Sequence, residues 1–194
     1  MRYCKPRRII EVGSGFSSAA MLDVNNLFLD DTVEFTFIEP HSDRLFNLLS
    51  REDKTKHTIL KRQVQDAPTE VFRTLSADDI LFIDSSHVVK IGSDVAHIMF
   101  NILPELQPGV LIHFDDIFWP FEYPEEWLLE GRAWNEAYFL RSFLQFNSAF
   151  EIMYFPSYIA EHHAEVLLEK MPLCLEGGRE GSLWLKKSSY SRLQ

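Results

Sequence analysis

The sequence is short of cysteine, of long hydrophobic stretches and of positive charge, and each shortage excludes a class of protein. Its two cysteines have no metal-ligand spacing, and without an export signal we expect reduced thiols in a cytoplasmic protein. No apolar run approaches the roughly 18 residues that cross a bilayer, so no membrane span is predicted. With 19 basic against 29 acidic residues, the net charge of −10 argues against nucleic acid as a partner.

The chain instead contains a regular alternation of short apolar runs and helix-like segments. Its 194 residues, 46% of them hydrophobic, fit a single domain over residues 1–194. The apolar runs predict strands at residues 7–13, 33–39, 57–61, 79–84, 109–115, 150–155 and 181–187. The segments between them predict helices at residues 17–28, 42–50, 68–75, 91–104 and 134–147.

This alternation predicts an α/β fold, a Rossmann-like doubly wound sheet of seven strands with helices on both faces. Three runs, at residues 7–13, 79–84 and 109–115, are almost entirely apolar, as expected for parallel strands buried on both faces. No helix of the usual packing length separates the last two runs. We therefore expect a mostly parallel sheet whose last strand returns antiparallel beside the sixth.

The segment IIEVGSGFSS, residues 9–18, gives the clearest chemical signal. Its glycines permit a tight turn between strand and helix and let a ligand approach the backbone. A dinucleotide fingerprint would have glycine where this chain has Ser18, which weakens the case for NAD. Glu11 suits a ligand with a positive amino group, such as S-adenosyl-L-methionine (SAM); a plain strand-to-helix turn is the alternative. The loop residues expected to contact a cofactor are Glu11, Gly13, Ser14, Gly15 and Ser17.

Polar side chains also follow the second and third predicted strands. Glu39 ends the second strand, where a carboxylate can accept both hydroxyls of a ribose. Gln65 and Asp66 follow the third strand, where a side-chain oxygen can accept a hydrogen bond from the adenine amine. A capped turn before the next helix explains Gln65 and Asp66 equally well.

The fourth strand ends in Asp84, Ser85, Ser86 and His87, at the edge of the sheet where ligands bind. The first three are expected to contact the cofactor. His87 is a candidate general base for an acceptor hydroxyl, although it could instead only hydrogen-bond the cofactor or order the loop.

The fifth strand ends in two adjacent carboxylates, Asp115 and Asp116. Together with Asp84 they could hold Mg²⁺ or another divalent cation, which would lower the pKa of an acceptor hydroxyl. Asp115 is also a candidate catalytic residue. The alternative is that Asp116 caps the following loop and Asp115 faces water or the cofactor.

The aromatic segment FWPFEYPEEW, residues 118–127, is too long for a simple turn. Loops at the carboxyl edge of a sheet often form an acceptor pocket or a lid. The same rings could pack on a second copy of the chain, so a homo-oligomer is also possible.

Taken in order, EVGSGFSS, FIEP, FIDSSH, HFDDIFWPFEYP and the closing GSLWLKK resemble the class I SAM-dependent methyltransferases, in particular the methyltransferase-24 branch. The resemblance covers residues 7–187. It implies SAM held by the first loop and Glu39, with Asp84 to His87 along its other side. It also implies that Asp84, Asp115 and Asp116 match the metal ligands of related small-molecule O-methyltransferases. Such enzymes carry a helical cover before the first strand, whereas about six residues precede it here, so the cover is expected to be missing or supplied by a partner subunit.

The preferred function is methyl transfer from SAM to a hydroxyl, with an amine as second choice, of a small molecule or sugar. The methyl carbon would be displaced in line, with the protein mainly positioning the two reactants. One alternative is a non-catalytic SAM-binding or interaction domain. Another is an iron-dependent oxygenase that uses His113 and Asp115 as an H-x-D pair.

Overall fold

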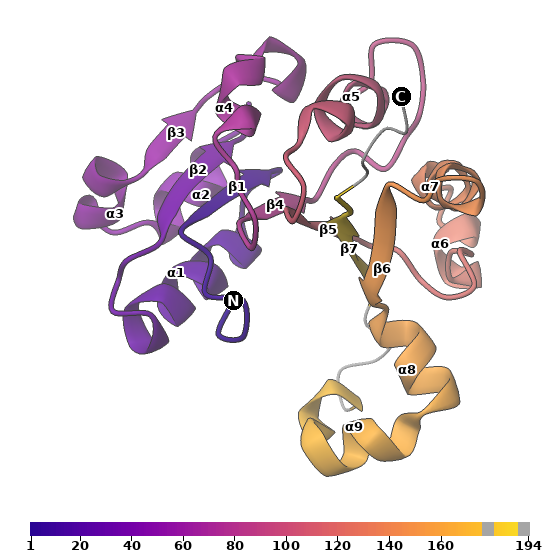
Figure 1. The fold of residues 1–194 in the computed structure, drawn as a ribbon. Coiled ribbons are helices and arrows are strands. Elements are labelled where there is room, and N and C mark those ends of the chain that lie inside the picture. Colours follow the sequence, from indigo (N-terminus) through magenta and orange to yellow (C-terminus); the bar gives the residue numbers. More distant parts are fainter. Residues whose placement is uncertain (176–180, 190–194) are drawn as a thin grey trace.

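The computed structural model describes residues 1–175 and 181–189, which form a seven-stranded sheet flanked by helices (Figure 1). The strands are β1 (Arg8–Val12), β2 (Glu34–Ile38), β3 (Thr58–Leu60), β4 (Ile80–Ile83), β5 (Leu111–Asp115), β6 (Phe150–Tyr154) and β7 (Ser182–Lys187). The α-helices are α1 (Phe16–Phe28), α2 (Asp43–Leu48), α3 (Arg51–Lys56), α4 (Thr69–Arg73), α5 (Asp94–His97), α6 (Glu125–Leu129), α7 (Glu136–Gln145), α8 (Pro156–His162) and α9 (Ala164–Lys170).

The strand order is β3-β2-β1-β4-β5-β7-β6, and this confirms the predicted Rossmann-like sheet. Strands β1 to β5 pair in parallel, and β7 runs antiparallel to both of its neighbours. The last strand therefore lies beside the sixth, as predicted, and also inserts between it and the fifth. From β1 the chain adds β2 and β3 on one side and then β4 and β5 on the other, and this change of side between β1 and β4 creates the switch point at which such sheets bind ligands.

The two faces of the sheet are covered by different helices. Ile9, on β1, belongs to a buried cluster with Met21 of α1 and Leu45 of α2. The next residue, Ile10, belongs to a second cluster on the other face, which includes Phe72 of α4. Because side chains alternate along a strand, Glu11 points to the same face as Ile9, toward α1. Figure 1 shows α1 below the sheet and α4 and α5 above it.

Two predicted helices differ from the observed ones because serine side chains cap them. The helix predicted at residues 42–50 ends at Leu48, and Ser50 starts α3 by exchanging hydrogen bonds with Asp53. The helix predicted from residue 91 starts at Asp94, since the Ser93 hydroxyl accepts a hydrogen bond from the Ala96 amide.

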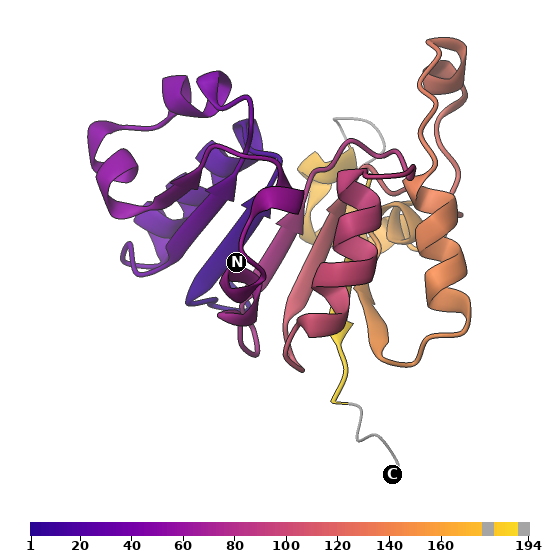
Figure 2. The ribbon, with the colours of Figure 1, turned by 90° about the horizontal axis from the view of Figure 1, so that it is seen from above.

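The connection between β6 and β7 contains two helices that were not predicted. Helices α8 and α9 are seven residues each, which leaves too little periodicity to identify them from sequence. In Figure 1 they extend below β6, and in Figure 2 the segment around α6 stands out beyond the end of α7. Within residues 1–175 and 181–189, no helix is long and apolar enough to cross a membrane.

Candidate functional site

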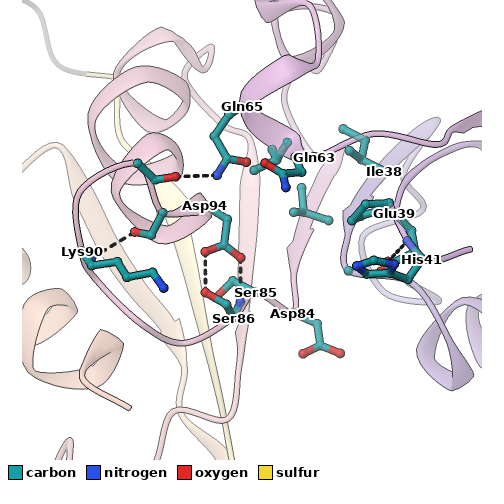
Figure 3. Close-up of a pocket in the computed structure, with 16 residues that line it drawn as sticks. Ile38, Glu39, His41, Gln63, Gln65, Asp84, Ser85, Ser86, Lys90 and Asp94 are labelled. Carbon is teal, nitrogen blue, oxygen red and sulfur yellow. Dashed lines mark hydrogen bonds between the residues drawn. The ribbon is translucent and has the colours of Figure 1, made fainter. Parts of the chain in front are cut away.

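A cavity of about 490 Å³ opens at the carboxyl ends of β1, β2 and β4. Its lining also includes the turn after β3 and the loop between β4 and α5 (Figure 3). The predicted cofactor residues in the lining are Gly13, Glu39, Gln65, Asp84, Ser85 and Ser86. The predicted cofactor residues outside the lining are Glu11, Ser14, Gly15, Ser17 and Asp66.

The fold requires glycine at position 13, whether or not a ligand is bound. Its φ is +79°, and a Cβ atom there would lie 1.8 Å from the carbonyl oxygen of Asp84. The close approach arises because the Asp84 amide donates to the Val12 carbonyl oxygen over 2.8 Å. Glycine thus lets the ends of β1 and β4 meet, and it leaves the backbone open to a ligand in the cavity.

Glu11 lies beneath the loop and is fully buried. Its two carboxylate oxygens accept hydrogen bonds from the hydroxyls of Ser17 and Ser18 in the first turn of α1. Burial raises the pKa of Glu11 to about 7, although the two serine hydroxyls act in the opposite direction. Glu11 therefore anchors α1 to β1, and it acts on the cavity only through its charge.

Glu39 is held at the cavity by two backbone amides. One oxygen accepts from the Ser14 amide over 3.1 Å, and the other accepts from the His41 amide over 2.6 Å. Ser14 therefore contributes to the site by fixing Glu39. A carboxylate fixed in this way keeps free lone pairs for the hydroxyls of a ribose.

Gln65 forms the opposite wall of the cavity. Its Nε2 donates to the Gly92 carbonyl oxygen over 2.9 Å, whereas its Oε1 is buried without a hydrogen-bond partner among the described residues. A buried acceptor that lacks a donor costs free energy, and a ligand amine could supply that donor. Asp66 is exposed and lies outside this wall.

Asp94 and Lys90 are among the lining residues that were not predicted. Asp94, at the start of α5, accepts from the Ser86 amide over 2.7 Å and also from the Ser86 hydroxyl. Lys90 extends its ammonium group toward Ser85 and Ser86 (Figure 3). A serine followed by an acidic residue at positions 93 and 94 is a helix-start signal, but it does not reveal that Asp94 folds back onto the β4 loop.

His87 lies just beyond the cavity and is almost fully buried. Its Nδ1 is 2.9 Å from an oxygen of Glu136, at the first residue of α7. Its Nε2 is 3.5 Å from Asp84 and 3.6 Å from Asp116. Glu136 was not identified from the sequence, because no local pattern links a helix start to a loop 49 residues earlier.

The pKa values of this cluster are strongly shifted. Burial alone would lower the pKa of His87, but Asp84, Glu136 and Asp116 outweigh it and raise that pKa to about 10. The imidazole therefore keeps its proton at neutral pH in this arrangement, and its role as a general base stays a prediction. Burial, followed by repulsion from Asp116 and Asp84, raises the pKa of Asp115 to about 7.

The three carboxylates predicted to bind Mg²⁺ do not fit that role as they are arranged. Within the described part of the chain, no three His, Cys, Asp or Glu side chains are placed to share one metal ion. The protonated ring of His87 instead lies between Asp84 and Asp116 and makes ion pairs with both. The predicted divalent-cation site is therefore not supported.

His113 does not support the oxygenase alternative. Its ring stacks on Phe82, with centroids 4.0 Å apart, and contacts the edge of Trp184. Burial lowers the pKa of His113 to about 3, so the ring is neutral. A histidine enclosed by aromatic side chains within the sheet is a packing residue, and it does not combine with Asp115 in any metal-binding group of the described residues.

The aromatic segment at residues 118–127 is mainly part of the core. Phe118, Phe121 and Tyr123 are buried, and the Tyr123 hydroxyl accepts from the Ala137 amide at the start of α7. Trp127 packs edge-on against Trp134, whose ring also contacts the His87 imidazole at a centroid distance of 4.1 Å. The segment thus connects the core to the His87 cluster.

Comparison with known proteins agrees with this architecture. Residues 10–117 match the methyltransferase-24 family, which is described as a methyltransferase domain. An uncharacterized protein of Archaeoglobus fulgidus is 39% identical over 79 residues, which are 39% of this chain and 34% of that protein. The match thus spans about a third of that relative's length. The CmcI-N160 apo structure superposes on 97% of this chain and 67% of its own, with a TM-score of 0.56 and 13% identity, a likeness in fold alone.

The family match covers more than half of the chain, and the fold and the position of the cavity are those expected of its members. The chain therefore belongs to the methyltransferase-24 family of class I SAM-dependent methyltransferases.

Proposed function

We propose that this chain transfers a methyl group from SAM to a hydroxyl group of a small molecule or sugar. The observation that carries the proposal is the cavity at the switch point, which brings Glu39, Gln65 and Asp84 to one ligand-sized space. The carboxylates in its lining suit a ligand with a positive sulfonium and a positive amino group.

The residues present match the parts of SAM. Glu39 accepts the ribose hydroxyls, and Gln65 Oε1 accepts a hydrogen bond from the adenine amine, which gives that buried oxygen a donor. Gly13 lets the ligand lie against the backbone. Glu11 lies beneath the loop, where Ser17 keeps its carboxyl group in place; its pKa of about 7 lets a positive ligand nearby favour the ionised form.

The sulfonium of SAM would supply an activated methyl group. The acceptor oxygen would form a bond to the methyl carbon as the carbon–sulfur bond breaks, with S-adenosylhomocysteine as the leaving group. Asp115, at the end of β5, takes the proton that the acceptor hydroxyl loses; its pKa, raised to about 7, suits a base that works near neutral pH. His87 stays protonated and balances the charge of Asp84 and Asp116. The protein contributes chiefly by positioning the reactants and excluding water.

Replacing Glu39 tests the cofactor assignment. Glu39→Ala removes the ribose acceptor, and we expect SAM affinity to fall by about tenfold or more, since a hydrogen bond to a charged group contributes roughly 1.5–3 kcal/mol. Glu34→Ala is the matched control, because Glu34 is an exposed carboxylate at the other end of the same strand. Calorimetric titration with SAM, S-adenosylhomocysteine and NAD measures the effect. Equal SAM affinity of Glu39→Ala and the wild type would rule out the ribose contact.

The acceptor class is tested by turnover. Formation of S-adenosylhomocysteine is measured across panels of small-molecule and sugar hydroxyls and of amines. We expect methylation of hydroxyls, and a lower rate in Asp115→Asn at unchanged SAM affinity. SAM binding without turnover on any acceptor would favour the non-catalytic binding domain, and turnover on amines alone would exclude the hydroxyl assignment.

A further inference from the structure

We propose that Glu136 is a positioning residue, which orients the imidazole of His87 so that Nε2, and not Nδ1, faces Asp84 in the wall of the cavity. The inference rests on the proposed function, because that function gives the protonated His87 a role between Asp84 and Asp116. It adds a residue from α7 to a site built mainly from strand ends, their loops and the start of α5.

The contact between the two side chains is short and enclosed. Glu136 is 2% exposed, and its Oε2 lies 2.9 Å from Nδ1 of His87. Both carboxylate oxygens also lie 3.1 Å from the Ser85 hydroxyl, which donates to them. The same hydroxyl accepts from the His87 amide over 3.1 Å. Ser85 therefore links the carboxylate to the backbone of the residue that it orients.

The bond to Nδ1 decides where the other nitrogen points. With Nδ1 directed at Glu136, Nε2 faces Asp84 and Asp116 at 3.5 and 3.6 Å. Asp84 lines the cofactor cavity, so Nε2 faces a residue of the cavity wall. Trp134 packs on the ring with centroids 4.1 Å apart and limits its rotation. In the protonated imidazole both ring nitrogens carry a proton, and Nδ1 directs its proton at the Glu136 carboxylate.

The backbone of His87 is also held by the start of α7. Its φ is +58°, a conformation that residues other than glycine rarely adopt. Its carbonyl oxygen accepts from the amides of Asn135 and Glu136, over 3.0 and 3.2 Å. Strained conformations held by surrounding bonds are typical of functional sites.

The Glu136 side chain is not needed merely to hold the β4 loop against α7. The backbone bonds to His87 and the Asn135 side chain, which bonds both the amide and the carbonyl oxygen of Val89, already tie the β4 loop to α7. Burying a carboxylate costs free energy that a tie between backbones does not require. What the Glu136 carboxylate adds is control of the imidazole, as in sites where a third group orients the base or acid.

Nuclear magnetic resonance of histidine ring nitrogens tests the inference directly. Glu136→Gln keeps the volume and removes the charge. Glu122→Gln is the matched control, because Glu122 is an exposed carboxylate that accepts from Tyr138 on the same helix without touching His87. His87→Gln assigns the His87 signals. At neutral pH, we expect a slowly exchanging Nδ1 proton in the wild type and in Glu122→Gln, and a clear shift of that signal in Glu136→Gln.

The functional arm uses S-adenosylhomocysteine as the probe. Its addition should shift the Nε2 signal in the wild type and in Glu122→Gln, and should shift it less in Glu136→Gln at an affinity within about twofold, since Glu136 does not line the cavity. With an acceptor that the wild type methylates, kcat should fall by about tenfold or more in Glu136→Gln and partly recover in Glu136→Asp, with little change in KM.

Unchanged ring signals or an unchanged kcat in Glu136→Gln would overturn the positioning role. If Glu136→Gln lost stability, S-adenosylhomocysteine affinity and kcat to the same extent, Glu136 would be a structural residue only. If no variant and no wild-type protein binds S-adenosylhomocysteine, the proposed function fails, and the Nδ1 signal alone still decides whether Glu136 orients His87.

Discussion

Gly13 is the residue at which fold and site depend on each other most directly. Its positive φ and its contact with the Asp84 carbonyl oxygen allow the ends of β1 and β4 to lie side by side at the cavity. Gly15, two positions later, differs from Gly13. Its φ is −179°, and an added Cβ would meet only the Arg44 side chain, at 3.2 Å. The two glycines of one motif therefore have different physical roles.

Gly13→Ala should destabilise the protein by about 2 kcal/mol or more. Alanine is strained at the positive φ of this position, and its Cβ clashes with the carbonyl oxygen of Asp84. Gly15→Ala, which needs only a small movement of Arg44, should stay close to wild-type stability. Urea unfolding measures both. Equal stability of the two variants would mean that the contact between Gly13 and Asp84 does not constrain the fold.

Glu11 should make stability depend on pH. Its pKa is about 7 in the folded protein against an ordinary value of 4.5, so the folded state favours the protonated form. The resulting stabilisation is complete below pH 4.5 and is lost as pH rises through about 7. Glu11→Gln has no such loss, so its stability relative to the wild type should increase over this range, by at most about 3 kcal/mol. Unfolding in urea across this pH range tests the prediction; parallel curves for the two proteins would contradict it.

At the scale of elements, the amino ends of the strands are tied together by one buried carboxylate. Asp79 is 1% exposed, and one of its oxygens accepts from the amides of Arg7 and Arg8, each over 2.9 Å. The other accepts from the amide and the hydroxyl of Ser76. Asp79 thus joins the start of β1 to the segment that leads into β4, at the end of the sheet away from the cavity.

Asp79→Ala should cost about 2–4 kcal/mol, because it leaves several backbone amides without acceptors. Asp79→Asn keeps one carbonyl oxygen for the two strand amides and should lose less. Urea unfolding gives the stabilities, and SAM titration should show nearly unchanged affinity in both. A large loss of SAM affinity with normal stability would show that the two ends of the sheet are coupled.

The elements differ in how well local sequence predicts them. The strands were predicted because buried parallel strands leave continuous apolar runs, as at residues 79–84. Glu39, Gln65 and Asp84 were predicted as a group because the carboxyl ends of such strands meet at one edge. Glu136 and Asp94 were missed because their contacts depend on how α7 and α5 dock, which no pattern near them records.

At the scale of the whole molecule, the fold gathers acidic groups where a cationic ligand would bind. Glu39, Asp84 and Asp94 line one cavity in a chain whose net charge is −10. Only His41 and Lys90 among the lining residues can carry positive charge. Such a field attracts the sulfonium of SAM and disfavours the pyrophosphate of NAD.

SAM should therefore stabilise the whole molecule, and NAD should not. At a concentration 100 times its Kd, SAM should add about 2.7 kcal/mol to the free energy of unfolding. Hydrogen exchange should slow at the cavity loops, around residues 38–41, 63–65 and 84–94. Protection by NAD, or protection by SAM confined to another part of the sheet, would contradict the assignment of the cavity.

The sequence by itself determined the strands, their alternation with helices and the carboxylates at the strand ends, because these follow from periodicity and from positions next to apolar runs. Only the tertiary structure decided which of those groups face the cavity. It turned Glu11 beneath α1, placed His87 between Asp84 and Asp116 in place of a metal ion, and brought Glu136 to His87 from α7. The physical reason is that side-chain direction and pKa depend on burial and on partners distant in sequence, which local patterns do not contain.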